Sequence, residues 1–261
     1  MTTAPTDSAT TETAAAVGIR SSALFGVAPY YQDAYVTLYH GSSVDMLPHD
    51  YAPESVVTDP PYGVGFKYDS YEDTPENFDA IRQLLTRLAA NAGQMALMMS
   101  MRQLWSMPKP KWMLCWAKPG SCRRSSIGGF SEWEPVLLYG KGWKIANDLK
   151  ILPDCVNHSK DAAKDHPCPK PEKLMTWIVN HTTGVVVDPF AGSGTTLLAA
   201  KQLNRQSIGW EIEERYCEII ASRLAQGVLD FSPPNNVRTG HEPAAGSGYG
   251  GATGSGNKET A

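Results

Sequence analysis

The strongest constraint on this chain is a short apolar run that ends in an acidic residue and turns through two glycines. Residues 185–187 are three valines, Asp188 follows them, and Gly192 and Gly194 precede a helix expected to begin at Thr195. A β-branched run predicts a buried strand, and glycines between a strand and a helix let backbone amides approach a ligand closely. The pattern therefore predicts a ligand-binding turn in an α/β fold.

A second carboxylate follows at the spacing that nucleoside-binding folds use. The next expected strand, around Ile208, ends in Gly209-Trp210-Glu211, about 20 residues after Asp188. A carboxylate there can accept hydrogen bonds from both hydroxyls of a ribose. A dinucleotide site would have a third glycine, and Asp188 would repel a pyrophosphate. The pair predicts a nucleoside-containing cofactor that carries a positive amino group or sulfonium.

Short apolar runs alternate with helical patterns along the chain, which predicts an α/β fold with a mainly parallel, seven-stranded sheet covered on both faces. Thr74-Pro75 is typical of a helix start. Strands are expected at 35–40, 55–58, 95–99, 112–116, 136–139, 185–187 and around Ile208, and helices at 75–88, at 171–180, from Thr195, and at 213–225.

One domain at residues 21–232 is expected between two tails. Residues 1–20 are rich in Thr and Ala, residues 233–261 are rich in Gly and Ser, and neither shows apolar periodicity, so both are predicted to be disordered. Residues 119–165 are less regular and contain several glycines and lysines. This stretch is the predicted insertion.

Charge is unevenly distributed in this chain of 261 residues and net charge −4. No acidic residue lies between Asp79 and Glu132, whereas Arg82, Arg87, Arg102, Lys109, Lys111, Lys118, Arg123 and Arg124 all do. A local basic patch attracts a phosphate backbone whatever the net charge. Nucleic acid is therefore the expected partner, although these residues could also be solvated helix positions.

Other classes are disfavoured by the sequence. It contains no apolar run of membrane-spanning length and no signal-peptide pattern, so a soluble, intracellular protein is expected, with no membrane partner. The five cysteines are odd in number and predict reduced thiols. A zinc site is conceivable but does not have a standard ligand spacing, so no metal is expected; its four residues would be Cys155, His158, His166 and Cys168.

The second chemical signal is Asp59-Pro60-Pro61-Tyr62, directly after the strand expected at 55–58. Two consecutive prolines fix the backbone and remove its amide donors. The Asp59 carboxylate and the Pro60 carbonyl then project as acceptors suited to an NH₂ group, and Tyr62 offers an aromatic face to a planar base. Alone, the tetrapeptide could be an ordinary turn.

Together these residues resemble the DNA amino-methyltransferases that modify adenine N6 or cytosine N4. That family is marked by an Asp/Asn/Ser-Pro-Pro-Tyr tetrapeptide and a Phe-x-Gly-x-Gly loop, and the order found here resembles its permuted β-type subgroup. The resemblance spans residues 35–224. Further similar segments are His166-Pro167-Cys168-Pro169-Lys170-Pro171, Gly209-Trp210-Glu211-Ile212 with Tyr216, Trp116-Ala117-Lys118, and Glu134-Pro135.

The resemblance implies a Rossmann-like fold, S-adenosylmethionine as cofactor and double-stranded DNA as partner. A base would flip against Tyr62, and its amino group would be held by Asp59 and the Pro60 carbonyl for direct transfer of the methyl group. The implied catalytic residues are Asp59, Pro60, Pro61 and Tyr62. The implied cofactor-binding residues are Asp188, Phe190, Gly192, Ser193, Gly194, Thr195, Glu211 and Lys170.

One position departs from the family pattern. The family commonly has an acidic residue right after the glycine that ends its first strand, whereas this chain has Ser42 after Gly41. Either a serine replaces that contact to the cofactor adenine, or Asp45 reaches it from the following turn.

The target and the partners are less constrained. Asp59 favours adenine N6 over cytosine N4, and residues 119–165 are expected to recognise DNA, with Lys118, Arg123, Arg124, Lys141 and Lys144 as contacts. RNA or protein-glutamine methylation, a catalytically silent DNA-binding subunit and a nucleotide-binding oxidoreductase remain alternatives. A homodimer and a cognate restriction endonuclease are left open, and the expected location is the cytoplasm of a bacterial or virus-infected bacterial cell.

Overall fold

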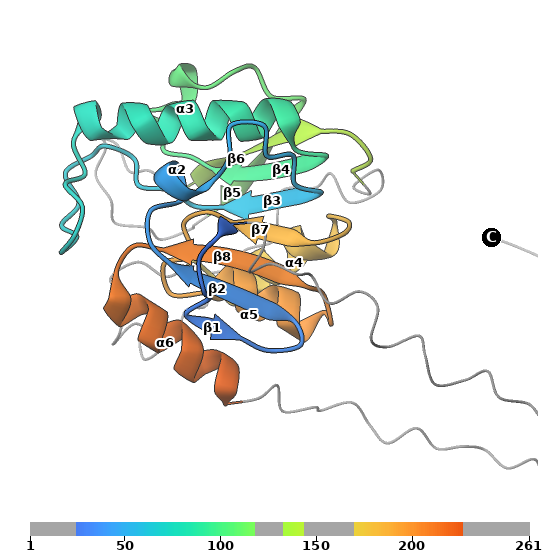
Figure 1. The fold of residues 1–261 in the computed structure, drawn as a ribbon. Coiled ribbons are helices and arrows are strands. Elements are labelled where there is room, and N and C mark those ends of the chain that lie inside the picture. The colour runs from blue at the N-terminus through green and yellow to red at the C-terminus, as the bar shows by residue number, and fades with distance from the viewer. Residues whose placement is uncertain (1–24, 118–132, 144–169, 227–261) are drawn as a thin grey trace, which may run out of the picture. The chain divides into compact units, whose positions relative to one another are not determined.

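A mixed sheet forms the centre of the molecule, and its five middle strands run parallel (Figure 1). The computed structural model describes residues 25–117, 133–143 and 170–226. Within them the sheet has eight strands in the order β1 (Tyr31–Gln32), β2 (Val36–His40), β8 (Ser207–Glu211), β7 (Val186–Asp188), β3 (Ser55–Thr58), β4 (Gln94–Met98), β6 (Trp133–Gly140) and β5 (Trp112–Ala117). Strands β1, β6 and β5 each pair antiparallel with their neighbours.

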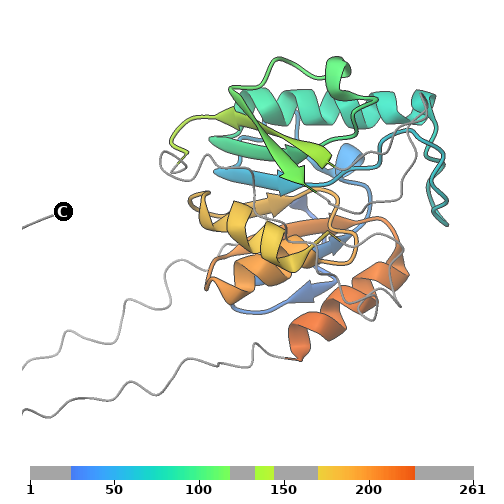
Figure 2. The same ribbon diagram turned by 180° about the vertical axis from the view of Figure 1, so that it is seen from behind.

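Helices cover both faces of this sheet. Helix α3 (Pro75–Asn91) packs on one face, where its apolar side chains join residues of β3, β4, β7 and β8 in one core cluster. The other face carries α4 (Glu172–Asn180), α5 (Thr195–Gln202) and α6 (Glu214–Ala225), which the turned view places in front of the sheet (Figure 2). Buried strands with helices on both faces require apolar side chains in both directions, and β3, β4 and β8 are buried along their whole length.

Helix α3 shows how local sequence sets an element. Thr74 caps its first turn by accepting a hydrogen bond from the Asn77 amide at 3.2 Å, and Pro75 has no amide to leave unsatisfied there. Apolar residues at helical spacing then face the sheet, and all of them are buried: Phe78, Ile81, Leu84, Leu85 and Leu88.

The α/β fold and the mainly parallel sheet predicted from the sequence are confirmed, and every expected strand and helix is present within a few residues of its predicted bounds. The predicted strand number was one short. The additional strand, β1, has only two residues and rests on a turn held by Asp33, whose carboxylate accepts hydrogen bonds from the amides of Tyr35 and Val36 at 2.8 Å. A two-residue strand has no periodicity that a sequence could reveal.

The insertion predicted at residues 119–165 includes residues that belong to the central sheet. Residues 133–140 form β6, which pairs with both β4 and β5 and therefore belongs to the sheet. The rest of that stretch, and the tails predicted at 1–20 and 233–261, lie outside the described residues. No helix in the described ranges is both long and apolar enough to cross a membrane.

Candidate active site

The carboxyl ends of the parallel strands surround one cavity. Parallel strands end at the same edge of a sheet, so the segments after β2, β3, β7 and β8 meet there. The tetrapeptide 59–62, the loop 188–193, Glu211 and residues 41–44 all line this cavity. Chain segments more than a hundred residues apart are thereby joined in one site.

The glycine turn forms part of the cavity lining. Phe190, Gly192, Ser193 and Thr195 line it directly. Gly194 does not line it; instead this residue caps α5 in a left-handed conformation with φ of 79°, and a Cβ there would lie 2.8 Å from Ile220 Cγ1. Glycine is therefore required at position 194 by the backbone turn and by close helix packing.

Asp188 is a buried carboxylate at the end of β7, with only 2% of its surface exposed. Its Oδ1 accepts hydrogen bonds from the Thr58 hydroxyl at 2.7 Å and from the Phe190 amide at 3.1 Å. Burial raises its pKa to about 6, in opposition to the hydrogen bonds that favour the charged form. A cationic ligand beside this carboxylate would stabilise its charged form and offset the cost of desolvation.

Glu211 ends β8 and is 7% exposed. Its Oε2 accepts the Gly192 amide at 2.7 Å and its Oε1 accepts the Glu213 amide at 2.9 Å, so the side chain is fixed at the rim of the glycine turn. Burial is the largest of the effects on its pKa, which is raised to about 7. Each oxygen keeps a further lone pair that can accept a ligand hydroxyl.

Asp59 is held on both oxygens by neighbouring side chains. The Tyr62 hydroxyl donates to Oδ1, and the Lys170 ammonium donates to Oδ2 at 2.5 Å. Lys170 also lies 3.9 Å from a Glu134 carboxylate oxygen and 5.8 Å from the centre of the Tyr62 ring. Burial raises the pKa of Tyr62, so this hydroxyl remains a donor. The tetrapeptide is therefore fixed in place by ionic and aromatic contacts.

Lys170 is the residue whose placement differs most from its predicted role. The sequence grouped it with the cofactor-binding residues, yet its ammonium contacts Asp59 in the tetrapeptide, 111 positions away along the chain. It lines the same cavity as the glycine turn. A contact of Lys170 with the cofactor stays a prediction. Its observed contact with Asp59 adds a second candidate role, which is to hold that carboxylate beside the expected position of the target amino group.

Two buried carboxylates that the sequence did not reveal hold the loop after the tetrapeptide. Asp73 is 3% exposed and accepts hydrogen bonds from the amides of Gly63, Val64 and Phe66 at 2.6, 3.0 and 3.0 Å. Glu213 accepts the Ser70 amide at 2.6 Å. Their contacts join residues 10 and 143 positions apart, for which a single sequence has no local signal.

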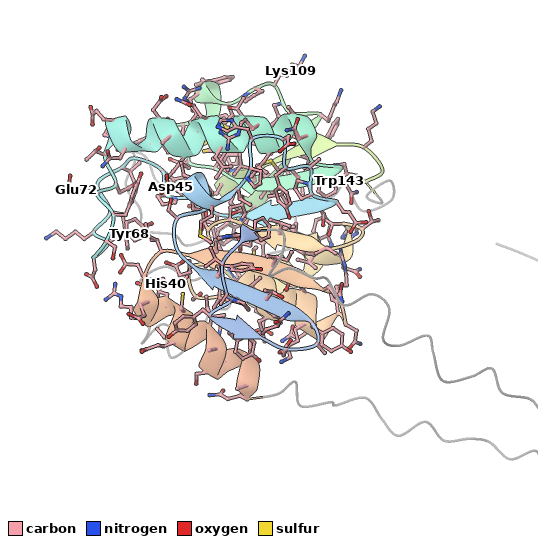
Figure 3. All side chains as sticks on the ribbon, viewed as in Figure 1. His40, Asp45, Tyr68, Glu72, Lys109 and Trp143 are labelled. Atoms are coloured by element: carbon pink, nitrogen blue, oxygen red, sulfur yellow. The ribbon has the colours of Figure 1, made fainter. Side chains whose placement is uncertain are left out.

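The loop 63–73 thus connects the two halves of the site. One end follows Tyr62 and is held by Asp73, and its tip is held by Glu213, whose own amide donates to Glu211. Figure 3 shows Tyr68 and Glu72 of this loop on the same side of the molecule as His40, the last residue of β2. The carboxylate expected to bind ribose is therefore linked, through this loop and its hydrogen bonds, to the turn expected to be catalytic.

At the position that departs from the family pattern, Gly41, Ser42 and Ser43 line the cavity. Asp45 is exposed and is not among the lining residues. Of the two options left open by the sequence, the serines are the residues that the structure places at the cavity.

Of the five residues predicted to contact DNA, the structure describes Lys141 alone. Lys118, Arg123, Arg124 and Lys144 lie outside the described residues, as do all four residues of the conceivable zinc site. Lys141 follows β6 at the other edge of the sheet, where its amide donates to the Gly93 carbonyl at 2.9 Å. Figure 3 accordingly shows Trp143 on the side opposite to Tyr68 and Glu72.

Comparison with known proteins agrees with this arrangement. A sequence model described as DNA methylase, for the N6/N4 methyltransferases, matches residues 100–222. The type II methyltransferase M.ScaI of Streptomyces caespitosus is 26% identical, with 75% of this chain and 83% of that protein covered. M.HindIII of Haemophilus influenzae is 48% identical over 39% of this chain and 47% of its own length.

Solved structures show the same fold. The structure of M1.HpyAVI is 25% identical and has a TM-score of 0.53, with 72% of this chain and 98% of that chain covered. PvuII DNA methyltransferase, which is cytosine-N4-specific, is 20% identical with a TM-score of 0.59 and coverages of 76% and 89%.

The fold is the Rossmann-like fold of S-adenosylmethionine-dependent methyltransferases, and the cavity lies at the carboxyl edge of its sheet. More narrowly, the sequence model and the relatives support an amino-methyltransferase similar to the family that modifies adenine N6 or cytosine N4. The tetrapeptide and the glycine turn by which the sequence resembled this family lie together in one site.

Proposed function

We propose that this protein transfers a methyl group from S-adenosylmethionine to the N6 amino group of adenine in double-stranded DNA. The observation that carries the proposal is that Asp59 and Pro60 line the same cavity as Asp188 and Glu211. Acceptors for an amino group and acceptors for a cationic nucleoside are thereby held by one rigid sheet edge. Few other chemistries need both sets together.

The residues present fit this cofactor. Glu211 is fixed by two backbone amides and can still accept ribose hydroxyls. The buried Asp188 carboxylate suits the positive amino end of the methionine moiety. Phe190, Gly192, Ser193 and Thr195 line the space between them. When bound, S-adenosylmethionine supplies an electrophilic methyl group on a sulfonium.

The chain's own residues then select and orient the amino group. Tyr62 provides a stacking surface for a base that has left the duplex, and Asp59 and the Pro60 carbonyl accept its two N–H hydrogens. Because Tyr62 and Lys170 already donate to the two Asp59 oxygens, the amino group must share an oxygen or displace one donor. Asp59 is also the acceptor for the proton that the amine loses once it is methylated.

Adenine is proposed as the target because the tetrapeptide begins with Asp59. Serine at this position is the commoner choice among cytosine-N4 enzymes of the family, and the acceptor geometry is otherwise shared. PvuII methyltransferase, which is cytosine-N4-specific, has the same fold at 20% identity, so fold likeness does not separate the two targets.

Incubation with radiolabelled S-adenosylmethionine and unmethylated duplex DNA tests the proposal. After digestion, chromatography of the nucleosides should place the label in N6-methyladenine. Label in N4-methylcytosine would keep the enzyme class and overturn the base. Cofactor binding without label in DNA would overturn the activity and favour an RNA or protein substrate or a silent subunit.

The setting of the activity follows from its substrate. We propose that the enzyme acts on bacterial DNA in the cytoplasm. The relatives include type II methyltransferases and also the orphan methyltransferase M.BamHII of Bacillus amyloliquefaciens, so a cognate restriction endonuclease and a homodimer both stay predictions. Challenge of the methylated DNA with restriction enzymes identifies the protected sequence.

A further inference from the structure

One large aromatic side chain stands out from the surface close to the tetrapeptide. Trp105 is 89% exposed and belongs to a short 3₁₀ helix, η1 (Leu104–Ser106), in the segment that follows β4. We call residues 100–106 the tryptophan turn. An indole combines a large, rigid apolar surface with one polar N–H group, which suits it to contact a partner.

The tryptophan turn is held firmly beneath this side chain. Leu104 packs against the core cluster under α3, and Ser106 donates its amide and hydroxyl to the Gln103 carbonyl at 3.0 and 2.7 Å. The Gln103 amide donates in turn to the Ser100 carbonyl at 3.0 Å. Trp105 is thus exposed on a fixed support.

The same turn is attached to the catalytic segment. The Gln103 side-chain amide donates to the backbone carbonyl of Tyr62 at 3.0 Å. The residue expected to stack on the target base and the exposed indole are therefore carried by two segments that contact each other. The tryptophan turn is thus joined directly to the tetrapeptide that lines the cavity.

Charge on this surface favours nucleic acid over protein. Arg102 and Met101 are exposed on the turn, and no acidic residue occurs in the sequence between Asp79 and Glu132. An exposed guanidinium can bind a phosphate, and an apolar side chain beside it can enter a base step. A nucleic acid offers a phosphate to Arg102 and a base step to Met101.

We propose that Trp105 fills the gap in the DNA stack that the target base leaves, while Arg102 binds a nearby phosphate. The inference rests on the proposed function, since only a base-extruding enzyme creates such a gap. An indole has the size and planarity to replace a base in the stack. Trp105 would then hold the base in its extruded position rather than touch the reacting atoms.

The test compares Trp105→Ala with Trp112→Ala, because Trp112 is a second exposed tryptophan, at 56%, on the outermost strand β5. The substrate is a duplex that carries the site found by sequencing the modified DNA. Trp105→Ala should lower single-turnover methylation by about 10-fold, the order of one lost stacking interaction. Trp112→Ala and the S-adenosylmethionine affinity of both variants should remain as in the unchanged protein.

A mismatched target base separates base extrusion from ordinary DNA affinity. A mispaired base is easier to unstack, so the defect of Trp105→Ala should shrink on the mismatched duplex, and Trp105→Phe should restore part of the rate on the matched one. A defect of equal size on both duplexes, or one shared with Trp112→Ala, would overturn the role of Trp105. Absence of methylation by the unchanged protein would instead refute the proposed function.

Arg102 is tested through salt dependence. Loss of one phosphate contact should reduce the slope of log affinity against log salt concentration by about 1 in Arg102→Ala. An unchanged slope would remove Arg102 from the contact surface.

Discussion

The two edges of the sheet use charged residues in opposite ways. At the amino edge, Arg205 donates to backbone oxygens of Val179, Thr182 and Gly184, and Glu54 accepts the Val185 amide at 2.7 Å. At the carboxyl edge, Asp188 and Glu211 are buried beside a cavity and their pKa values are raised. Charges at the first edge join turns of the chain, whereas those at the second are available to a ligand.

The difference shows that the number of charged hydrogen bonds does not identify a functional site. Burial disfavours the charged form of Asp188 and Glu211 more than their hydrogen bonds favour it. A cationic or hydroxyl-bearing ligand would remove that imbalance. Arg205 instead donates to backbone oxygens and is not among the residues that line the cavity. Mutations at either edge test this difference.

The largest effect is expected for Asp59→Ala at the carboxyl edge. Removal of the acceptor for the amino group should lower the methylation rate constant by about 1000-fold, with S-adenosylmethionine affinity within about twofold of the unchanged protein. Single-turnover kinetics and equilibrium dialysis measure the two quantities. Asp45→Ala, at an exposed position outside the cavity-lining residues, is the matched control, and an active Asp59→Ala variant would exclude Asp59 from catalysis.

Glu211→Gln should weaken S-adenosylmethionine binding by about 10- to 100-fold, because hydrogen bonds to a carboxylate are replaced by weaker ones. Calorimetry measures the dissociation constant. A rate at saturating cofactor that stays near that of the unchanged protein would confirm that Glu211 binds rather than reacts. An unchanged dissociation constant would refute the ribose contact.

The raised pKa of Glu211 adds a pH test to the same residue. Its pKa moves from the ordinary 4.5 to about 7, so the unfolded chain loses this proton at lower pH than the folded protein does. The free energy of unfolding without cofactor should therefore fall as pH rises through this window, while cofactor affinity rises as the carboxylate ionises. Urea titrations and dissociation constants at several pH values should show both trends. In Glu211→Gln, the pH dependence of both quantities near pH 7 should disappear.

Asp73→Asn should lower the methylation rate constant by about 10-fold, because one of the two oxygens that accept the loop amides becomes a donor. Cofactor affinity should change little, which separates loop positioning from binding. Asp69→Asn, which disturbs only an exposed ion pair of the same loop with Arg215, serves as control. Equal effects of the two variants would show that Asp73 has no special role in positioning Tyr62.

Arg205→Ala should act on stability alone. Loss of its hydrogen bonds to backbone carbonyls at the amino edge should lower the free energy of unfolding by about 2 kcal/mol. Urea denaturation gives the loss, and the rate per folded molecule should be unchanged. A change in cofactor affinity in this variant would contradict the division between the two edges.

Lys141→Ala should have the smallest effect. The sequence predicted a DNA contact for Lys141, but this residue follows β6 at the amino edge and is not among the residues that line the cavity. DNA affinity and its salt dependence should match those of the unchanged protein, in contrast to Arg102→Ala. A reduced salt slope in Lys141→Ala would mean that DNA reaches the amino edge as well.

Local signals in the sequence predicted the elements that carry the site. The valine run, the glycine turn and the two prolines act through their own backbone, so Asp59, Asp188 and Glu211 could be assigned to strand ends before their positions were known. Their convergence follows from the parallel order of β3, β7 and β8.

Contacts across long stretches of chain could not be predicted in this way. Asp73 and Glu213 act on amides of a loop, and the Lys170 ammonium reaches a carboxylate 111 residues earlier. Such contacts depend on tertiary geometry and leave no spacing or periodicity in one sequence. The same holds for the tryptophan turn, whose importance depends on the contact of Gln103 with Tyr62.

We propose that one sheet edge binds the cofactor beside β7 and β8 and the target amino group beside β3. A crystal structure with S-adenosylhomocysteine would locate both positions. Ribose hydroxyls should be hydrogen-bonded to Glu211, the amino end of the ligand should lie near Asp188, and the sulfur should face Asp59. A ligand whose ribose bonds to other residues, or whose sulfur points away from the tetrapeptide, would contradict it.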